Sequence, residues 1–168
     1  MTTTNIVFVG LGGQGVLKAS DIMAEAAFRA GFDVKKSEVH GMSQRGGSVT
    51  SDVRFGERIA SPMVPAGEAD FVVAFDEAES RRTAPLLKPG GVLVGPADVA
   101  GVNLPSSRSL NVALLGALSA RLGCIGEQHW LAALAEAFSG EVLAKNREAF
   151  DAARRSACLR VAEGRDDA

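Results

Sequence analysis

The chain alternates short apolar runs with longer segments whose apolar residues recur at helical spacing. Residues 5–9 and 70–75 are dominated by apolar side chains, which is the pattern of strands buried on both faces of a sheet. Residues 49–55 alternate apolar and polar side chains, which predicts a strand that buries one face and lies near a sheet edge. Residues 32–39 and 91–94 complete the predicted strands.

Helices are predicted between and after these strands. In the first of them the apolar positions follow helical periodicity, and Gly31 supplies a C-terminal stop. The predicted helices cover residues 16–30, 76–87, 110–122, 127–138 and 141–161. Residues 97–108 are predicted to form a loop with room for one short strand, and residues 163–168 a flexible tail.

Strands that alternate with helices predict an α/β fold: a three-layer α/β/α, Rossmann-like domain with a mixed, mostly parallel sheet. The length of 168 residues suits one domain, and we expect residues 1–168 to form it. Hydrophobic residues make up 46% of the chain and charged residues 23%, which is a globular composition.

Charge and cysteine content argue against several classes of function. A formal net charge of -2 gives no support for nucleic-acid binding through bulk charge. The two cysteines, Cys124 and Cys158, are far apart and form no Cys-x-x-Cys pattern, so we expect neither a disulfide scaffold nor a metal or iron–sulfur site. The first apolar run is too short for a signal sequence or a membrane span, so a cytoplasmic protein without a membrane partner is expected.

A glycine-rich loop, GLGGQG, follows the first strand and precedes the first helix. Its Gly10, Gly12 and Gly15 match the spacing of a dinucleotide-type phosphate loop, in which backbone N–H groups at a helix N-terminus receive an anion. A tight strand–helix turn that binds nothing gives the same pattern. The ribose-reading acid expected about 20 residues further on is replaced by Lys35 and Lys36, which opposes NAD and fits NADP or coenzyme A.

A second glycine-rich stretch, HGMSQRGG, follows the second strand. Arg45, beside Gly46 and Gly47, is suited to offer a guanidinium fork to a phosphate or carboxylate, and His40 to donate a hydrogen bond or titrate near neutral pH. We expect the two glycine loops to meet at the edge where open α/β sheets bind ligands. The alternative interpretation is that these glycines form turns and Arg45 is a surface cation.

Together, the GGQG and QRGG sequences resemble the gamma-type subunit of 2-oxoacid:ferredoxin oxidoreductases. The likeness extends over about residues 5–155, with Asn111–Gly116 similar to the family's Asn-x-x-x-Leu-Gly and residues 145–150 similar to its C-terminal Lys-x-Asn-x-x-Ala-Phe. His-Gly-Met-Ser-Gln stands here where pyruvate and oxoglutarate members usually have Tyr-Gly-Pro-Glu. This difference favours the small (beta) subunit of the indolepyruvate ferredoxin oxidoreductases.

The resemblance implies a large partner subunit that holds thiamine pyrophosphate and iron–sulfur clusters and decarboxylates a 2-oxoacid. Electrons would pass to ferredoxin and the acyl group to coenzyme A, an EC 1.2.7 type of reaction. A domain like this one would pack beside the thiamine site in a hetero-oligomer, be inactive alone and be able to self-associate when isolated.

No catalytic or metal-ligating residue is expected on this chain, only contacts to coenzyme A or to the partner subunit. The candidate contacts are Gly10, Gly12, Gly13, Gln14, Gly15, His40, Arg45, Gly46 and Gly47. A free-standing oxidoreductase that binds NADP or another nucleotide, and a nucleotide-sensing module, are the alternative functions.

Overall fold

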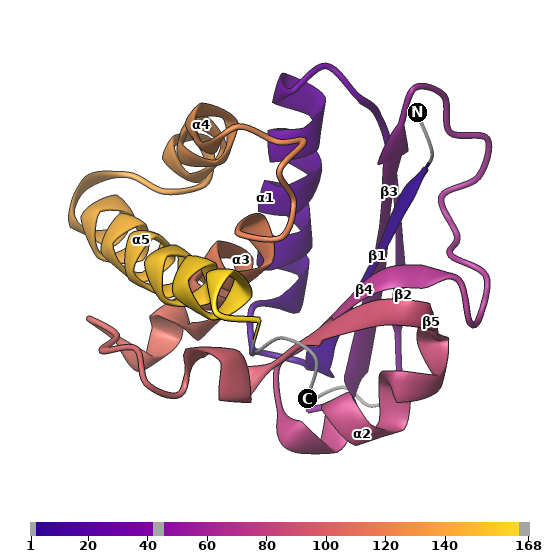
Figure 1. The fold of residues 1–168 in the computed structure, drawn as a ribbon, viewed down its shortest axis with the longest axis horizontal. Coiled ribbons are helices and arrows are strands. Elements are labelled where there is room, and N and C mark those ends of the chain that lie inside the picture. Colours follow the sequence, from indigo (N-terminus) through magenta and orange to yellow (C-terminus); the bar gives the residue numbers. More distant parts are fainter. Residues whose placement is uncertain (1–2, 42–45, 165–168) are drawn as a thin grey trace.

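A five-stranded sheet forms the centre of the computed structural model, which describes residues 3–41 and 46–164 (Figure 1). The strand order is β2-β3-β1-β4-β5. The strands are β1 (Thr4–Leu11), β2 (Asp33–His40), β3 (Ser48–Gly56), β4 (Ala69–Ala74) and β5 (Leu87–Val94). All five predicted strands are therefore present.

The sheet is mixed, as predicted: four of its five strands run in the same direction, and β3 runs against them. β1 pairs with β4 and β4 with β5 in parallel, whereas β3 runs antiparallel to both β1 and β2. Alternate residues of β3, from Val49 to Phe55, are buried, which confirms that one face of this strand is covered. The edge position belongs to β2, however, and β3 lies one strand inside it.

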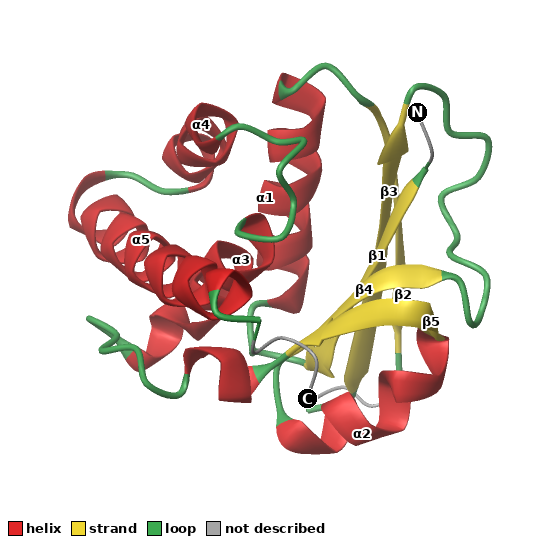
Figure 2. Ribbon diagram, viewed as in Figure 1, coloured by secondary structure: helices red, strands yellow, loops and turns green. Residues whose placement is uncertain are grey.

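Helices follow β1, β4 and β5, and they make up most of the C-terminal third of the chain (Figure 2). The α-helices are α1 (Val16–Arg29), α2 (Glu77–Thr83), α3 (Leu110–Ser119), α4 (Glu127–Ala137) and α5 (Gly140–Ala162). Short 3-10 helices, η1 (Ala84–Leu86), η2 (Pro96–Val99) and η3 (Ser107–Ser109), lie between them. The short strand allowed for in residues 97–108 is therefore wrong: Asp98 folds back to accept the N–H of Gly95 and fixes a 3-10 turn there.

The sheet carries helices on both faces, but unequally. Helices α1, α3, α4 and α5 lie on one side and α2 lies on the other (Figure 1). Because successive side chains of a strand point to opposite faces, Ile6 and Phe8 of β1 join the core under the four helices, whereas Val7 and Val9 join a smaller core on the α2 side. The three-layer α/β/α prediction is confirmed, with a thin third layer. None of the helices that the structure describes is both long and apolar enough to span a bilayer.

The chain leaves β1 and β4 toward opposite faces of the sheet. α1, which follows β1, lies on the four-helix side, and α2, which follows β4, lies on the other side (Figure 2). Neighbouring parallel strands whose connections diverge in this way leave a crevice at their carboxyl ends, and such crevices are the usual ligand sites of open α/β sheets. The fold thus places the first glycine loop at this switch point.

Candidate functional site at the carboxyl edge of the sheet

The first glycine loop ends in an uncapped helix N-terminus. Gly15 is the N-cap of α1 with a φ of 82°, and no described side chain caps the helix. The first turn of α1 also contains no acidic residue. The free N–H groups and the positive end of the helix dipole therefore favour an anion at this point.

Packing inside the protein accounts for two glycines of the loop. A Cβ on Gly10 would lie 2.7 Å from Gln14 Oε1 and 2.7 Å from Val16 Cγ2. A Cβ on Gly15 would lie 2.5 Å from Nδ2 of Asn111, the second residue of α3. A side chain at either position would force its neighbours to shift, and the positive φ of Gly15 adds backbone strain, so packing and backbone conformation favour glycine there whether or not a ligand binds.

The middle of the loop, in contrast, is open. A Cβ built on Gly13, which has a φ of 90°, meets no atom of the described residues within 4 Å, and both Gly12 and Gly13 are exposed. A ligand can therefore approach the backbone closely at these two residues.

The two glycine loops meet, as predicted. The Gly12 N–H donates to the Gly47 carbonyl over 2.9 Å, because Leu11 and Ser48 are paired at the ends of β1 and β3. Gly46, with a φ of 67°, is exposed beside this contact. Arg45 lies outside the described residues, so its assignment stays a prediction.

His40 reaches the same edge of the sheet but not the first loop. It is the last residue of β2, is exposed, and has its Nε2 3.6 Å from Glu38 Oε2. Two strand spacings separate β2 from β1, which corresponds to about 10 Å. Any contact of His40 with a ligand on the first loop must therefore span β3.

Of the two lysines in the position of the ribose-reading acid, Lys36 is engaged within the protein. Lys36 Nζ binds Asp21 Oδ1 over 2.5 Å and also binds Glu38, so two carboxylates already engage the ammonium. Burial opposes this charge, yet the hydrogen bonds and charges of the two carboxylates outweigh it and raise the pKa of Lys36. The dinucleotide rule also fails here because β3 separates β2 from β1, whereas it requires them to be neighbours.

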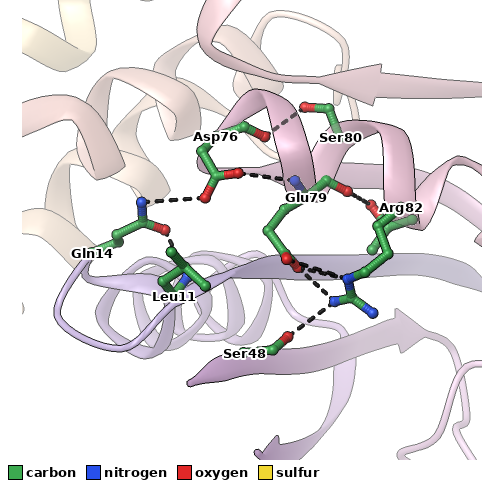
Figure 3. Close-up of polar contacts among 8 residues, drawn as sticks. Leu11, Gln14, Ser48, Asp76, Glu79, Ser80 and Arg82 are labelled. Carbon is green, nitrogen blue, oxygen red and sulfur yellow. Dashed lines mark hydrogen bonds and ion pairs between the residues drawn. The ribbon is translucent and has the colours of Figure 1, made fainter. Parts of the chain in front are cut away.

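Gln14 bridges the crevice between β1 and β4 (Figure 3). Its Oε1 accepts the Leu11 N–H over 2.7 Å, and its Nε2 donates to Asp76 Oδ2 over 3.4 Å. Asp76 also caps α2, since its Oδ1 accepts the Glu79 N–H over 2.9 Å. Gln14 therefore braces the loop across the switch point instead of projecting freely toward a ligand.

Two residues of this site, Asp76 and Asn111, are not among those predicted from the sequence. An aspartate between a buried strand and a helix is the ordinary signal of an N-cap, which could have placed Asp76 at this edge. The weak hydrogen bond from Asn111 Nδ2 to the Gly15 carbonyl, 3.4 Å long, joins residues 96 positions apart and has no local signal.

The other surface features of the described residues include a hollow and two free cysteines. A hollow of about 530 Å³ is lined by one residue of α4 and five of α5, and none of the predicted site residues borders it. Within residues 3–41 and 46–164, no three His, Cys, Asp or Glu side chains are grouped so as to hold a metal ion. Cys124 and Cys158 are free and exposed.

The sequence matches one protein family over most of its length. The family model described as pyruvate ferredoxin/flavodoxin oxidoreductase matches residues 5–106 and 97–156. The chain belongs to this family. The resemblance inferred from the two glycine blocks is thereby confirmed.

Individual relatives agree with the family. Indolepyruvate oxidoreductase subunit IorB of Thermococcus kodakarensis is 50% identical over 93 residues, which cover 55% of this chain and 46% of that relative. The match thus spans about half the length of either protein. The pyruvate/ketoisovalerate oxidoreductases common subunit gamma of Pyrococcus abyssi is 32% identical, over 87% of this chain and 95% of that relative.

A solved structure shares the fold. It is the 2-oxoglutarate:ferredoxin oxidoreductase from Magnetococcus marinus with 2-oxoglutarate, coenzyme A and succinyl-CoA bound. The TM-score is 0.80 at 25% identity, over 95% of this chain and 32% of that one. These relatives lend no support to the free-standing nucleotide-binding alternatives.

Proposed function

We propose that this chain is the small subunit of a thiamine-dependent 2-oxoacid:ferredoxin oxidoreductase that forms an acyl-CoA by oxidative decarboxylation. Indolepyruvate or another arylpyruvate is the proposed substrate class. The 50% identity to an indolepyruvate oxidoreductase subunit over 93 residues, against 32% to a common gamma subunit over a longer span of 178 residues, supports this branch of the family.

The observation that carries the proposal is the open backbone of Gly12 and Gly13 beside the uncapped N-terminus of α1. Coenzyme A carries phosphates, and a phosphate fits free N–H groups at the positive end of a helix. We assign this edge of the sheet to coenzyme A, with His40, Gly46 and Gly47 on its β2–β3 side. Arg45 is included on the sequence evidence alone.

The large partner subunit would hold the thiamine pyrophosphate and the iron–sulfur clusters. There, thiamine pyrophosphate would supply the carbanion-stabilising chemistry that decarboxylation needs, and the clusters would supply electron transfer. The present chain would act as one gamma-type domain over residues 1–168, docked on that subunit in a hetero-oligomer. Its own groups would hold coenzyme A, and none of them would take part in breaking or forming the bonds of the oxoacid.

Reconstitution tests this proposal. The purified chain, the large subunit and their mixture are each assayed for reduction of ferredoxin that requires both indolepyruvate and coenzyme A. We expect turnover only in the mixture, and less of it with pyruvate in place of indolepyruvate. Turnover by the small chain alone, or an unchanged rate when it is omitted, would refute the subunit assignment.

A further inference from the structure

Arg82 lies at the carboxyl edge of the sheet, although the sequence does not mark it as a site residue. Its Nη2 donates to Ser48 Oγ over 3.0 Å (Figure 3). Ser48 directly follows Gly47, whose carbonyl accepts the Gly12 N–H. The guanidinium therefore lies one residue away from the contact between the two glycine loops.

Glu79 fixes the orientation of this guanidinium. Arg82 Nε lies 3.2 Å from each carboxylate oxygen of Glu79, and Nη2 lies 2.5 Å from Oε2. The Glu79 side chain is only 10% exposed, whereas that of Arg82 is 54% exposed. Because a buried carboxylate requires a charged partner, Glu79 holds one side of Arg82 in a defined position.

The other side of the guanidinium stays available. Nε and Nη2 have acceptors in Glu79 and Ser48, but Nη1 has none among the residues that the structure describes. In Figure 3 this nitrogen points away from the protein groups that hold the rest of the side chain. Arg82 thus presents two oriented N–H donors beside the ligand edge.

Helix α2 does not depend on Arg82 for its own hydrogen bonds. Asp76 caps its N-terminus, Ser80 Oγ donates to the Asp76 carbonyl over 3.0 Å, and Thr83 Oγ1 donates to the Glu79 carbonyl over 2.6 Å. The formation of α2 therefore does not explain why the Arg82 guanidinium is hydrogen-bonded to Ser48 on β3.

We propose that Arg82 is a ligand-contacting residue of the carboxyl-edge site, which binds phosphate oxygens of coenzyme A through its Nη1 N–H groups. This inference rests on the proposed function, since it takes coenzyme A as the ligand of that edge. Glu79 neutralises the charge of Arg82, so binding depends on directed N–H donors more than on net attraction. The α1 N-terminus supplies the favourable potential from the other side.

A test must separate this role from the pairing with Glu79. Truncating Arg82 alone leaves a buried carboxylate without a partner and destabilises the chain for reasons unrelated to a ligand. We therefore compare E79Q with E79Q/R82M, each assembled with the large subunit, because neither variant contains an unpaired buried charge. R81M is the matched control: it removes the same charge one residue earlier, where Arg81 is exposed.

The readouts are thermal unfolding, affinity for the large subunit, and the KM for coenzyme A. We expect E79Q and E79Q/R82M to unfold at similar temperatures, and the double variant to raise the KM about tenfold or more. R81M should leave the KM unchanged. R82K should raise it, because an ammonium cannot reproduce the fixed planar geometry in which a guanidinium binds Glu79 and Ser48 on one side and a phosphate on the other.

An equal KM in E79Q and E79Q/R82M would overturn the proposal. Weaker assembly at an unchanged KM would also overturn it and would assign Arg82 to a carboxylate of the partner. G13A distinguishes failure of this inference from failure of the proposed function, because its methyl group enters the open part of the loop. If G13A raises the KM while E79Q/R82M does not, only the role of Arg82 is wrong; if neither raises it, the site itself is wrong.

Discussion

Replacing Gly15 with alanine tests how the glycine loop is built. The backbone at Gly15 has a φ of 82°, and an L-residue in the left-handed region costs about 1–2 kcal/mol. The new Cβ would also lie 2.5 Å from Asn111 Nδ2, and relieving such an overlap in a packed site costs about 1–3 kcal/mol. We expect a total loss of about 2–5 kcal/mol in the free energy of unfolding.

Gly13→Ala is the matched control, because its φ of 90° imposes backbone strain while its Cβ meets no atom within 4 Å in the part of the chain that the structure describes. Its expected cost is about 1–2 kcal/mol, and the difference between the two variants measures the packing of Asn111. For a chain of this size, 1 kcal/mol corresponds to about 2–4 °C in Tm. Calorimetry should show a clearly lower Tm for Gly15→Ala, and truncating Asn111 in that variant should restore part of it. Equal Tm values for Gly13→Ala and Gly15→Ala would refute this account of the loop.

Three further substitutions have distinct expected outcomes. Burial raises the pKa of Asp52 above its ordinary value of 3.8, and this effect outweighs the opposing effect of the hydrogen bond from the Val64 N–H. The folded chain therefore keeps the Asp52 carboxyl protonated to higher pH than the unfolded chain, and it loses stability as the pH rises through the raised pKa. Asp52→Asn should remove this decline in the free energy of unfolding, measured by urea unfolding between about pH 4 and 7. The same pH dependence in the variant and the natural chain would contradict this prediction. Gln14→Glu places a second carboxylate beside Asp76 and should lower Tm at neutral pH more than Gln14→Ala does, with the difference vanishing in acid. Lys36→Met should cost about 0.2–1 kcal/mol and leave the KM for coenzyme A unchanged, whereas a tenfold rise would restore Lys36 as a ligand contact.

Local patterns predict most of the elements of this fold. The apolar runs give β1 and β4, alternation gives the covered face of β3, and the glycine loop gives the start of α1. They do not give the order of strands. The β2–β3 hairpin inserts β3 between β2 and β1, and this depends on pairing between Leu11 and Ser48 that no local signal encodes.

Part of the candidate site can likewise be predicted from the sequence, and part cannot. The meeting of the glycine loops follows from the rule for carboxyl ends of strands, and it is found. The bridge from Gln14 to Asp76 joins residues 62 positions apart, so the sequence presents Gln14 as a ligand contact when its side chain is engaged within the protein. Arg82 follows Glu79 by three residues, which in the sequence is the spacing of an ordinary ion pair on the exposed face of a helix. Only the hydrogen bond from Arg82 to Ser48 on β3 indicates a place at the site.

Hydrogen exchange in the assembled complex tests the central claim most directly. The small chain bound to the large subunit is followed with and without saturating coenzyme A, in the absence of a 2-oxoacid. We predict slower exchange with coenzyme A at the amide of Gly13 and in the first turn of α1, and no change along α5, whereas the Gly12 amide is already bonded to the Gly47 carbonyl. Unchanged exchange in that loop at saturating coenzyme A, with protection elsewhere on the chain, would contradict the assignment of the carboxyl edge as the coenzyme A site.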